Sequence, residues 1–132
     1  MFAKSKNLIK TYINLLSHNN FYVRLCMLHT LAKSAYNLND TDVDNLLEKI
    51  DITDTNNISA ARAIESILLF LQTKGYDKQI ADFIDKLKLA NTAYSEYLQK
   101  ALIYWILQSK KQCWLFVDNL IYKSTNHKKN KT

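Results

Sequence analysis

The stretch VDNLLEK at residues 43–49 recurs, nearly unchanged, as VDNLIYK at residues 117–123. Each copy reads as a helical segment, and a long interval separates the two copies in a short chain. A helical phrase that occurs twice is typical of architectures built from repeated helical units. The two copies therefore indicate an internal repeat.

The composition of the chain favours helices throughout. Its 132 residues are 48% hydrophobic, which is enough for one domain with a sizeable core. The chain has no Pro and a single Gly, Gly75, so it lacks most of the residues that an all-β fold needs for its turns. Segments rich in Asn, Asp, Ser and Thr supply breaks instead, at residues 17–20, 37–42, 51–57 and 89–95. We predict an all-α protein in which these polar segments cap the helices that follow them.

A step of 38 residues aligns several sets of similar residues. The sets are Leu8, Leu46 and Ile84; Arg24, Arg62 and Lys100; Leu31, Leu69 and Leu107; and Asp44 and Asp82, with Asp118 arriving two residues early. A period near 40 residues with two helices in each copy is the signature of a helical solenoid. We predict a right-handed α-solenoid of about three and a half helix pairs.

The predicted helices number about seven. They cover residues 2–16, 20–36, 41–50, 58–74, 78–89, 92–109 and 111–124. The fourth is expected to be the most buried, because its apolar residues leave it little polar face. We predict one helical-repeat domain over residues 1–124 and a disordered basic tail over residues 125–132.

Two segments resemble known helical repeats. NNFYVRLCMLHTLAKS, at residues 19–34, resembles the second helix of a HEAT-type repeat, in which an apolar residue and Arg open the helix; here these are Val23 and Arg24. FYVRLCML and EYLQKALIYWILQSKK, at residues 21–28 and 96–111, look similar to segments of the DNA alkylation repair family, whose bacterial members are solenoid glycosylases that excise alkylated purines. Tyr104 stands where that family usually has Trp, and the family's catalytic Asp has no counterpart before Tyr22. The resemblance implies a shortened relative without that catalytic residue.

The cations of the repeat, Arg24, Arg62 and Lys100, have two interpretations. In the first they form a row that meets successive phosphates of a nucleic-acid backbone. In the second they pair with carboxylates of the adjacent repeat. Asp44, Asp82 and Asp118, the acidic set of the repeat, stand in register to do so. We prefer the second, because a helical repeat explains both sets without a ligand. Both interpretations place the cations on the inner side or between repeats.

Charge is distributed unevenly along the chain. Residues 1–37 have five cations and no acid, residues 38–99 have six cations and eleven acids, and residues 100–132 have seven cations and one acid. A solenoid that holds a nucleic-acid duplex is expected to be basic along its middle as well. Binding of nucleic acid through the basic ends is therefore the alternative, and not the first, interpretation.

Signatures of catalysis and of metal binding are missing from the sequence. His18, His29 and His127 are scattered without metal-ligand spacing, and Gly75 alone does not build a phosphate-binding loop. We expect no metal, no cofactor and no small-molecule substrate, and we favour a role without catalysis.

The cysteines and the first residues bear on the cellular compartment. Cys26 and Cys113 lie within apolar helical runs, which predicts buried, reduced thiols. Lys10, Thr11 and Asn14 interrupt the apolar stretch that a signal peptide or a membrane span requires. We expect a cytoplasmic protein without a transmembrane segment.

The last predicted helix has apolar residues on more than one face. A terminal solenoid helix needs a polar outer face because no further repeat covers it. Part of this apolar surface is therefore expected to stay exposed, unless the helix folds back and buries both sides. The candidate interface residues are Trp114, Phe116 and Tyr122, with Tyr104 and Trp105 from the preceding helix. We predict an interaction module that binds a protein partner or a second copy of itself.

Overall fold

Every regular element that the structure describes is helical, as the composition predicts. A computed structural model describes residues 2–131, and it describes the side chains of residues 8–123. The α-helices are α1 (Phe2–Leu15), α2 (Phe21–Lys33), α3 (Asp40–Lys49), α4 (Ile58–Thr73), α5 (Asp77–Ala90) and α6 (Ser95–Lys131). Two short 3₁₀ helices, η1 (Ala35–Asn37) and η2 (Ile52–Asn56), lie between them.

The prediction of seven helices is wrong by one. The two helices predicted at residues 92–109 and 111–124 are a single helix, α6, which is 37 residues long. Its supposed break, Ser109-Lys110-Lys111, contains neither Gly nor Pro, and Lys is a good helix former. A polar stretch of this kind makes the helix surface locally polar but does not end the helix. The same helix continues through residues 125–131, where the sequence predicts a disordered tail.

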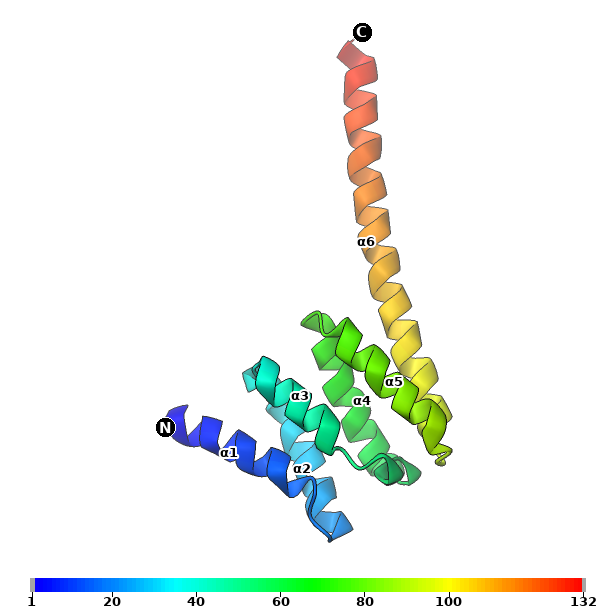
Figure 1. The fold of residues 1–132 in the computed structure, drawn as a ribbon. Coiled ribbons are helices and arrows are strands. Elements are labelled where there is room, and N and C mark those ends of the chain that lie inside the picture. Colours follow the sequence, from blue (N-terminus) through cyan, green and yellow to red (C-terminus); the bar gives the residue numbers. More distant parts are fainter. Residues whose placement is uncertain (1, 132) are drawn as a thin grey trace. The chain divides into compact units, whose positions relative to one another are not determined.

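The chain divides into two compact units, residues 1–102 and 103–132. The boundary lies inside α6 and inside the region that the sequence predicts to be one domain. In the first unit the helices form two rows (Figure 1): α1, α3 and α5 lie side by side, and α2 and α4 lie against them. Helix α1 contacts α2 and α3, α3 contacts α5, and α2 contacts α4. Every second helix of this unit, from α1 through α3 to α5, therefore contacts the next one in its row.

Asparagines cap the N-termini of three helices and the C-terminus of a fourth. The side chains of Asn20, Asn39 and Asn57 accept hydrogen bonds from backbone amides in the first turns of α2, α3 and α4. Asn39 forms a full capping box with Asp42. These caps confirm the predicted role of three of the polar breaks. Asn91 ends α5 in a left-handed conformation with φ of 49°.

The core of the first unit is centred on α4. Seven residues of α4 are buried, the largest number in any described helix, which confirms the prediction for this segment. They are Ala60, Ala61, Ala63, Ile64, Ile67, Leu68 and Leu71. The alanines at the start of the helix let neighbouring helices approach closely, and the larger aliphatic side chains fill the centre. Helix α4 contacts both α2 and α5, so it has little surface left for solvent.

Candidate functional site

Arg24 is held in a nearly buried ion pair. Its Nε and Nη2 atoms donate hydrogen bonds to the two carboxylate oxygens of Asp54, each at 2.9 Å, and Nη1 donates to the carbonyl oxygens of His18 and Asn19. The side chain of Arg24 is 14% exposed and that of Asp54 is 4% exposed. The hydrogen bond to Asp54 raises the pKa of Arg24 above its ordinary value, although partial burial opposes this effect. With its donors engaged in this way, Arg24 is poorly placed to bind a phosphate.

The other two cations of the repeat lie in different surroundings. Arg62 is exposed, and it forms no ion pair within the described part of the chain. Lys100 pairs with Glu96 one turn earlier in α6 at 3.0 Å, and both side chains are largely exposed. Arg62 lacks a partner equivalent to Asp54, because the residue 38 positions after Asp54 is Thr92, which has no carboxylate. The hydroxyl of Thr92 instead hydrogen-bonds that of Thr55.

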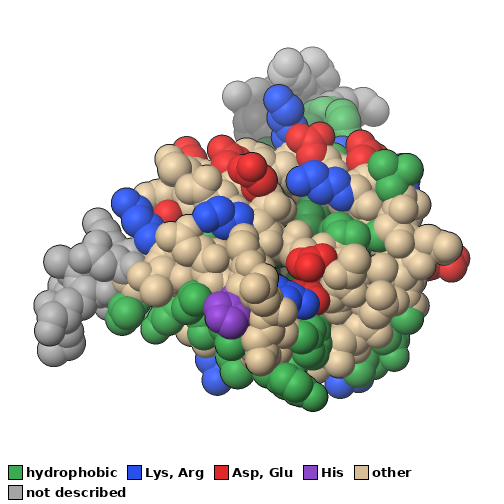
Figure 2. All heavy atoms as spheres, turned by 60° about the horizontal axis from the view of Figure 1, so that its bottom comes forward, with side chains coloured by type: hydrophobic (Ala, Val, Ile, Leu, Met, Phe, Trp, Pro, Cys, Tyr) green, Lys and Arg blue, Asp and Glu red, His purple; other side chains and the backbone are tan. Residues whose placement is uncertain are grey.

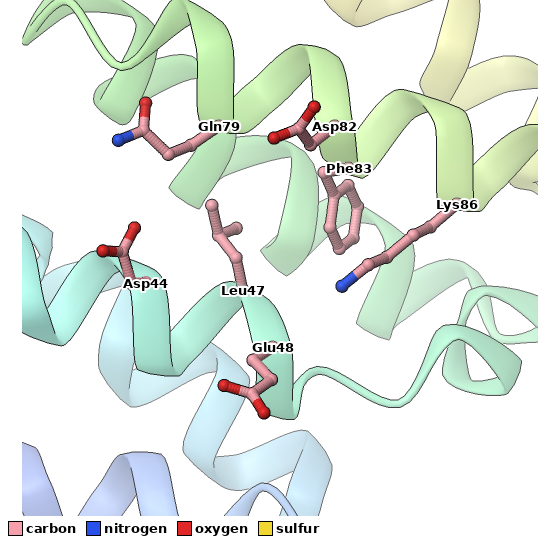
Figure 3. A pocket seen from close by; sticks show the side chains of 7 residues that line it. All are labelled: Asp44, Leu47, Glu48, Gln79, Asp82, Phe83 and Lys86. Atoms are coloured by element: carbon pink, nitrogen blue, oxygen red, sulfur yellow. The ribbon is translucent and has the colours of Figure 1, made fainter.

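Asp44 and Asp82, from the acidic set of the repeat, form no ion pair with Arg24, Arg62 or Lys100. Asp44 and Asp82 line a shallow pocket of about 150 Å³ between α3 and α5, together with Glu48 and Lys86 (Figure 3). Figure 3 shows Leu47 and Phe83 between the charged side chains; both are buried, so little apolar surface is available there. Asp44 and Asp82, and likewise Glu48 and Lys86, stand 38 positions apart in the sequence and line one groove. The carboxylate that pairs with Arg24 is Asp54, from the turn η2, and not Asp44.

Two tyrosines hydrogen-bond carboxylates that are more than 30 residues away in the sequence. The hydroxyl of Tyr97 donates to Glu65 at 2.6 Å, and that of Tyr76 donates to Asp40 at 2.5 Å. Each hydrogen bond raises the pKa of its tyrosine above the ordinary value of 10.0. A raised pKa in the folded chain means that the contact contributes stability below pH 10 and loses it as the pH rises through the raised pKa.

Replacing Tyr97 by Phe is expected to remove a proton that titrates late. In the folded wild-type protein, Tyr97 keeps its proton above pH 10.0 because the phenolate would lose the hydrogen bond to Glu65. Phenolate absorbance followed against pH should therefore lose amplitude at the alkaline end of the curve in Tyr97→Phe. Tyr36→Phe is the control, since Tyr36 is exposed and its hydroxyl makes no hydrogen bond to any described residue. Loss of an early-titrating proton in Tyr97→Phe would contradict the assignment.

The described residues contain no group of three metal-ligating side chains. The prediction of buried cysteines is wrong, because both Cys26 and Cys113 are exposed. An apolar neighbourhood in sequence does not bury a residue that lies on the uncovered face of its helix. His29 bonds the hydroxyl of Ser59 at 2.8 Å, from α2 to α4.

The predicted interface residues are all exposed. They are Tyr104, Trp105, Trp114, Phe116 and Tyr122, and all belong to the second unit. Trp114 is 67% exposed, an unusual value for the largest apolar side chain. Tyr104 and Trp105 pack edge to face with ring centroids 5.8 Å apart, and the other aromatic residues lie further along α6. Leu107 is also exposed and was missed in the prediction; the signal that could have found it is its spacing of seven residues from Trp114.

The repeated phrase has opposite surroundings in its two copies. In α3, Val43 and Leu46 are 0% exposed and Leu47 is 7% exposed, because α3 lies between α1 and α5. In α6, the corresponding residues Val117, Leu120 and Ile121 are 41%, 52% and 58% exposed. The same apolar pattern is therefore covered by helices in one place and uncovered in the other. We call the exposed apolar residues of α6 from residue 103 to residue 122 the α6 surface; these are Ile103, Tyr104, Trp105, Leu107, Trp114, Leu115, Phe116, Val117, Leu120, Ile121 and Tyr122.

Comparison with known proteins adds no family to these observations. The chain matches no protein-family model, no curated protein and no solved structure. Within the described residues, none of the helices combines the length and the apolarity needed to cross a bilayer.

Proposed function

We propose that the chain is a non-catalytic interaction module of the cytoplasm, in which HEAT-like helix pairs form a right-handed α-solenoid and the α6 surface contacts a protein. The two rows of helices in residues 1–102 and the 38-residue period support the repeat architecture. Contacts such as Arg24 with Asp54 and Tyr97 with Glu65 connect elements one repeat apart, as stacking of similar units requires. In this proposal the repeats are a scaffold and α6 is the part that binds.

The observation that carries the proposal is the uncovered copy of the repeated phrase. An exposed run of eleven large apolar residues within one helix is costly in water, because each exposed side chain keeps its unfavourable hydration. Large exposed apolar patches on soluble proteins are commonly contact sites. Trp and Tyr are also the residue types that contribute most strongly to protein interfaces. Covering the α6 surface would give Val117, Leu120 and Ile121 the surroundings that their counterparts have in α3.

The nucleic-acid alternative has weaker support. A binder of phosphate backbones related to the alkylation repair family would use the row of Arg24, Arg62 and Lys100. Asp54 already neutralises the first of these cations, and Glu96 pairs with the last. The face of the molecule drawn in Figure 2 carries acidic and basic side chains side by side, without a continuous positive field. A protein contact therefore explains more of the surface than a phosphate contact does.

The two exposed cysteines allow a direct test of coverage. Cys113 lies within the sequence span of the α6 surface, whereas Cys26 lies on α2 in the first unit, and both are exposed. We expect maleimide to label the two thiols at similar rates in dilute purified protein, after correction by the rates in the unfolded chain. In a native lysate of the source cells, Cys113 is expected to be protected and Cys26 to remain reactive, as mass spectrometry of the two peptides would show.

A matched variant makes this test specific. Trp114→Glu places a charge next to Cys113 and should restore its labelling in the lysate, because a buried unpaired carboxylate opposes contact. Labelling of Cys26 should not change in that variant. Equal labelling of the two cysteines in the lysate and in dilute protein would contradict the proposal.

A further inference from the structure

The second unit carries an apolar pattern that repeats every seven residues. Three rows have this spacing: Ile103, Lys110 and Val117; Ile106, Cys113 and Leu120; and Leu107, Trp114 and Ile121. Eight of these nine residues are apolar or Cys, and the rows lie next to one another on one side of the helix. A spacing of seven residues keeps an apolar seam facing a second helix over several turns. The pattern thus indicates that the partner of this side of α6 is another helix, which runs along α6.

We propose that the residue 103–121 face of α6 pairs with the same face of α6 in a second copy of the chain, in antiparallel orientation. This inference rests on the proposed function, since it names the partner of one face of the α6 surface. The face is suited to pairing with itself, because eight of its nine positions are apolar or Cys and no carboxylate occurs in the three rows. Lys110 is its one charged residue, and the alkyl stem of Lys110 can lie along apolar neighbours while the ammonium group stays in water.

The exposed area is sufficient for a dimer. The three rows contain six large apolar residues that are exposed, each by 41% to 67%: Ile103, Leu107, Trp114, Val117, Leu120 and Ile121. They offer roughly 600 Å² of side-chain surface on each helix, so a pair would bury roughly 1,200 Å², the lower limit for stable interfaces. Both tryptophans of the chain lie in this unit, and Trp114 lies on the seam itself.

Charge decides the orientation. Residues 103–132 contain six lysines and one aspartate, Asp118. A parallel pair in register would set Lys110, Lys111 and the lysine-rich end of each helix level with their own copies, which is unfavourable. An antiparallel pair centred near Trp114 brings Lys111 level with Asp118 of the second copy and moves the two lysine-rich ends apart. In the same alignment Cys113 lies within one residue of the level of Val117 of the second copy.

The net positive charge also predicts the effect of salt. Two helices of like charge repel one another, and salt screens that repulsion, so association of two copies should strengthen as the NaCl concentration rises. Binding of the same surface to an acidic protein, a nucleic acid or an anionic membrane would weaken with salt instead. The sign of the salt dependence therefore separates a second copy from the other occupants.

Sedimentation equilibrium of the full chain tests the pairing. We expect a monomer–dimer equilibrium whose Kd falls as NaCl rises. Leu120→Glu, on the seam, should raise the dimer Kd at least about tenfold, because the new carboxylate would be buried without a partner. Leu115→Glu is the matched control: Leu115 is 58% exposed against 52% for Leu120, but it lies on the opposite side of the helix, so its Kd should change by less than about threefold. A protein that stays monomeric at every concentration and salt would overturn the proposal, as would equal effects of the two variants.

Disulfide mapping tests the orientation. In a Cys26→Ser background, oxidised glutathione is expected to leave Cys113 without a link between copies, whereas Val117→Cys should yield a link between Cys113 and position 117 of the second copy. A link between the two Cys113 residues in the parent protein would overturn the antiparallel arrangement. Should the purified chain be monomeric while Cys113 is protected in a lysate, the pairing fails and the proposed function stands with a different partner. Tight binding to anionic vesicles by a monomer, weakened by salt, would also overturn the pairing.

Discussion

Replacing Leu46 by Ala is expected to lower the free energy of unfolding of the first unit by about 3 kcal/mol. Leu46 is fully buried in α3, which contacts both α1 and α5. The change removes buried apolar area and leaves a cavity that the neighbouring helices can close only in part. Urea titration followed by far-UV circular dichroism measures the loss.

The second copy of the phrase provides the control for this prediction. Leu120→Ala makes the same chemical change at the corresponding place in α6, where the side chain is 52% exposed. In dilute protein its effect on the free energy of unfolding of the first unit should stay within about 0.5 kcal/mol, because little packing is lost. Equal losses for the two variants would mean that residues 117–123 are packed as tightly as residues 43–49. That result would contradict both the exposure of the α6 surface and the function proposed for it.

Arg24→Ala is expected to destabilise the first unit by about 2 kcal/mol, since it leaves the nearly buried carboxylate of Asp54 without its ion-pair partner. Arg62→Ala and Lys100→Ala are the matched controls. Each removes a cation from a corresponding repeat position that is exposed to solvent, so each should change stability by no more than about 0.5 kcal/mol. The free energies of unfolding of the three variants, from urea titrations at two salt concentrations, give the comparison.

A double-mutant cycle isolates the ion pair itself. Because Arg24 and Asp54 act as one unit, the loss in Arg24→Ala/Asp54→Ala should be smaller than the sum of the two single losses. Additive losses would show that the two side chains act independently. Equal losses for Arg24, Arg62 and Lys100 would show that the three positions are equivalent in the folded chain, contrary to their different partners.

Local chemistry made most of the helices predictable. Asn20, Asn39 and Asn57 stand immediately before helices that they cap, and the absence of Pro leaves few other ways to end a helix. The failed break at Ser109-Lys110-Lys111 shows the limit of the same reasoning. A short polar run without Gly, Pro or a capping side chain is compatible with a continuous helix.

Tertiary partners were not predictable in the same way. The sequence offered Asp44 as a partner for Arg24 by register, but the turn η2 brings Asp54, 30 residues after Arg24, to the guanidinium group. Exposure is equally non-local: Cys26 and Cys113 lie in apolar runs, yet whether a face is covered depends on which helix lies against it. The five candidate interface residues, by contrast, follow from composition, because a single helix has too little polar face to hide so many aromatic residues.

Trp105 and Trp114 place all of the protein's tryptophan fluorescence on one helix, α6. Both indoles lie in residues 103–132, and residues 1–102 contain none. Tryptophan emission therefore reports on the polarity around α6 and not directly on any side chain of residues 1–102. A blue shift on mixing with a candidate ligand would localise the contact to one helix without a label, and the emission maximum of the chain alone would show whether its indoles are in water.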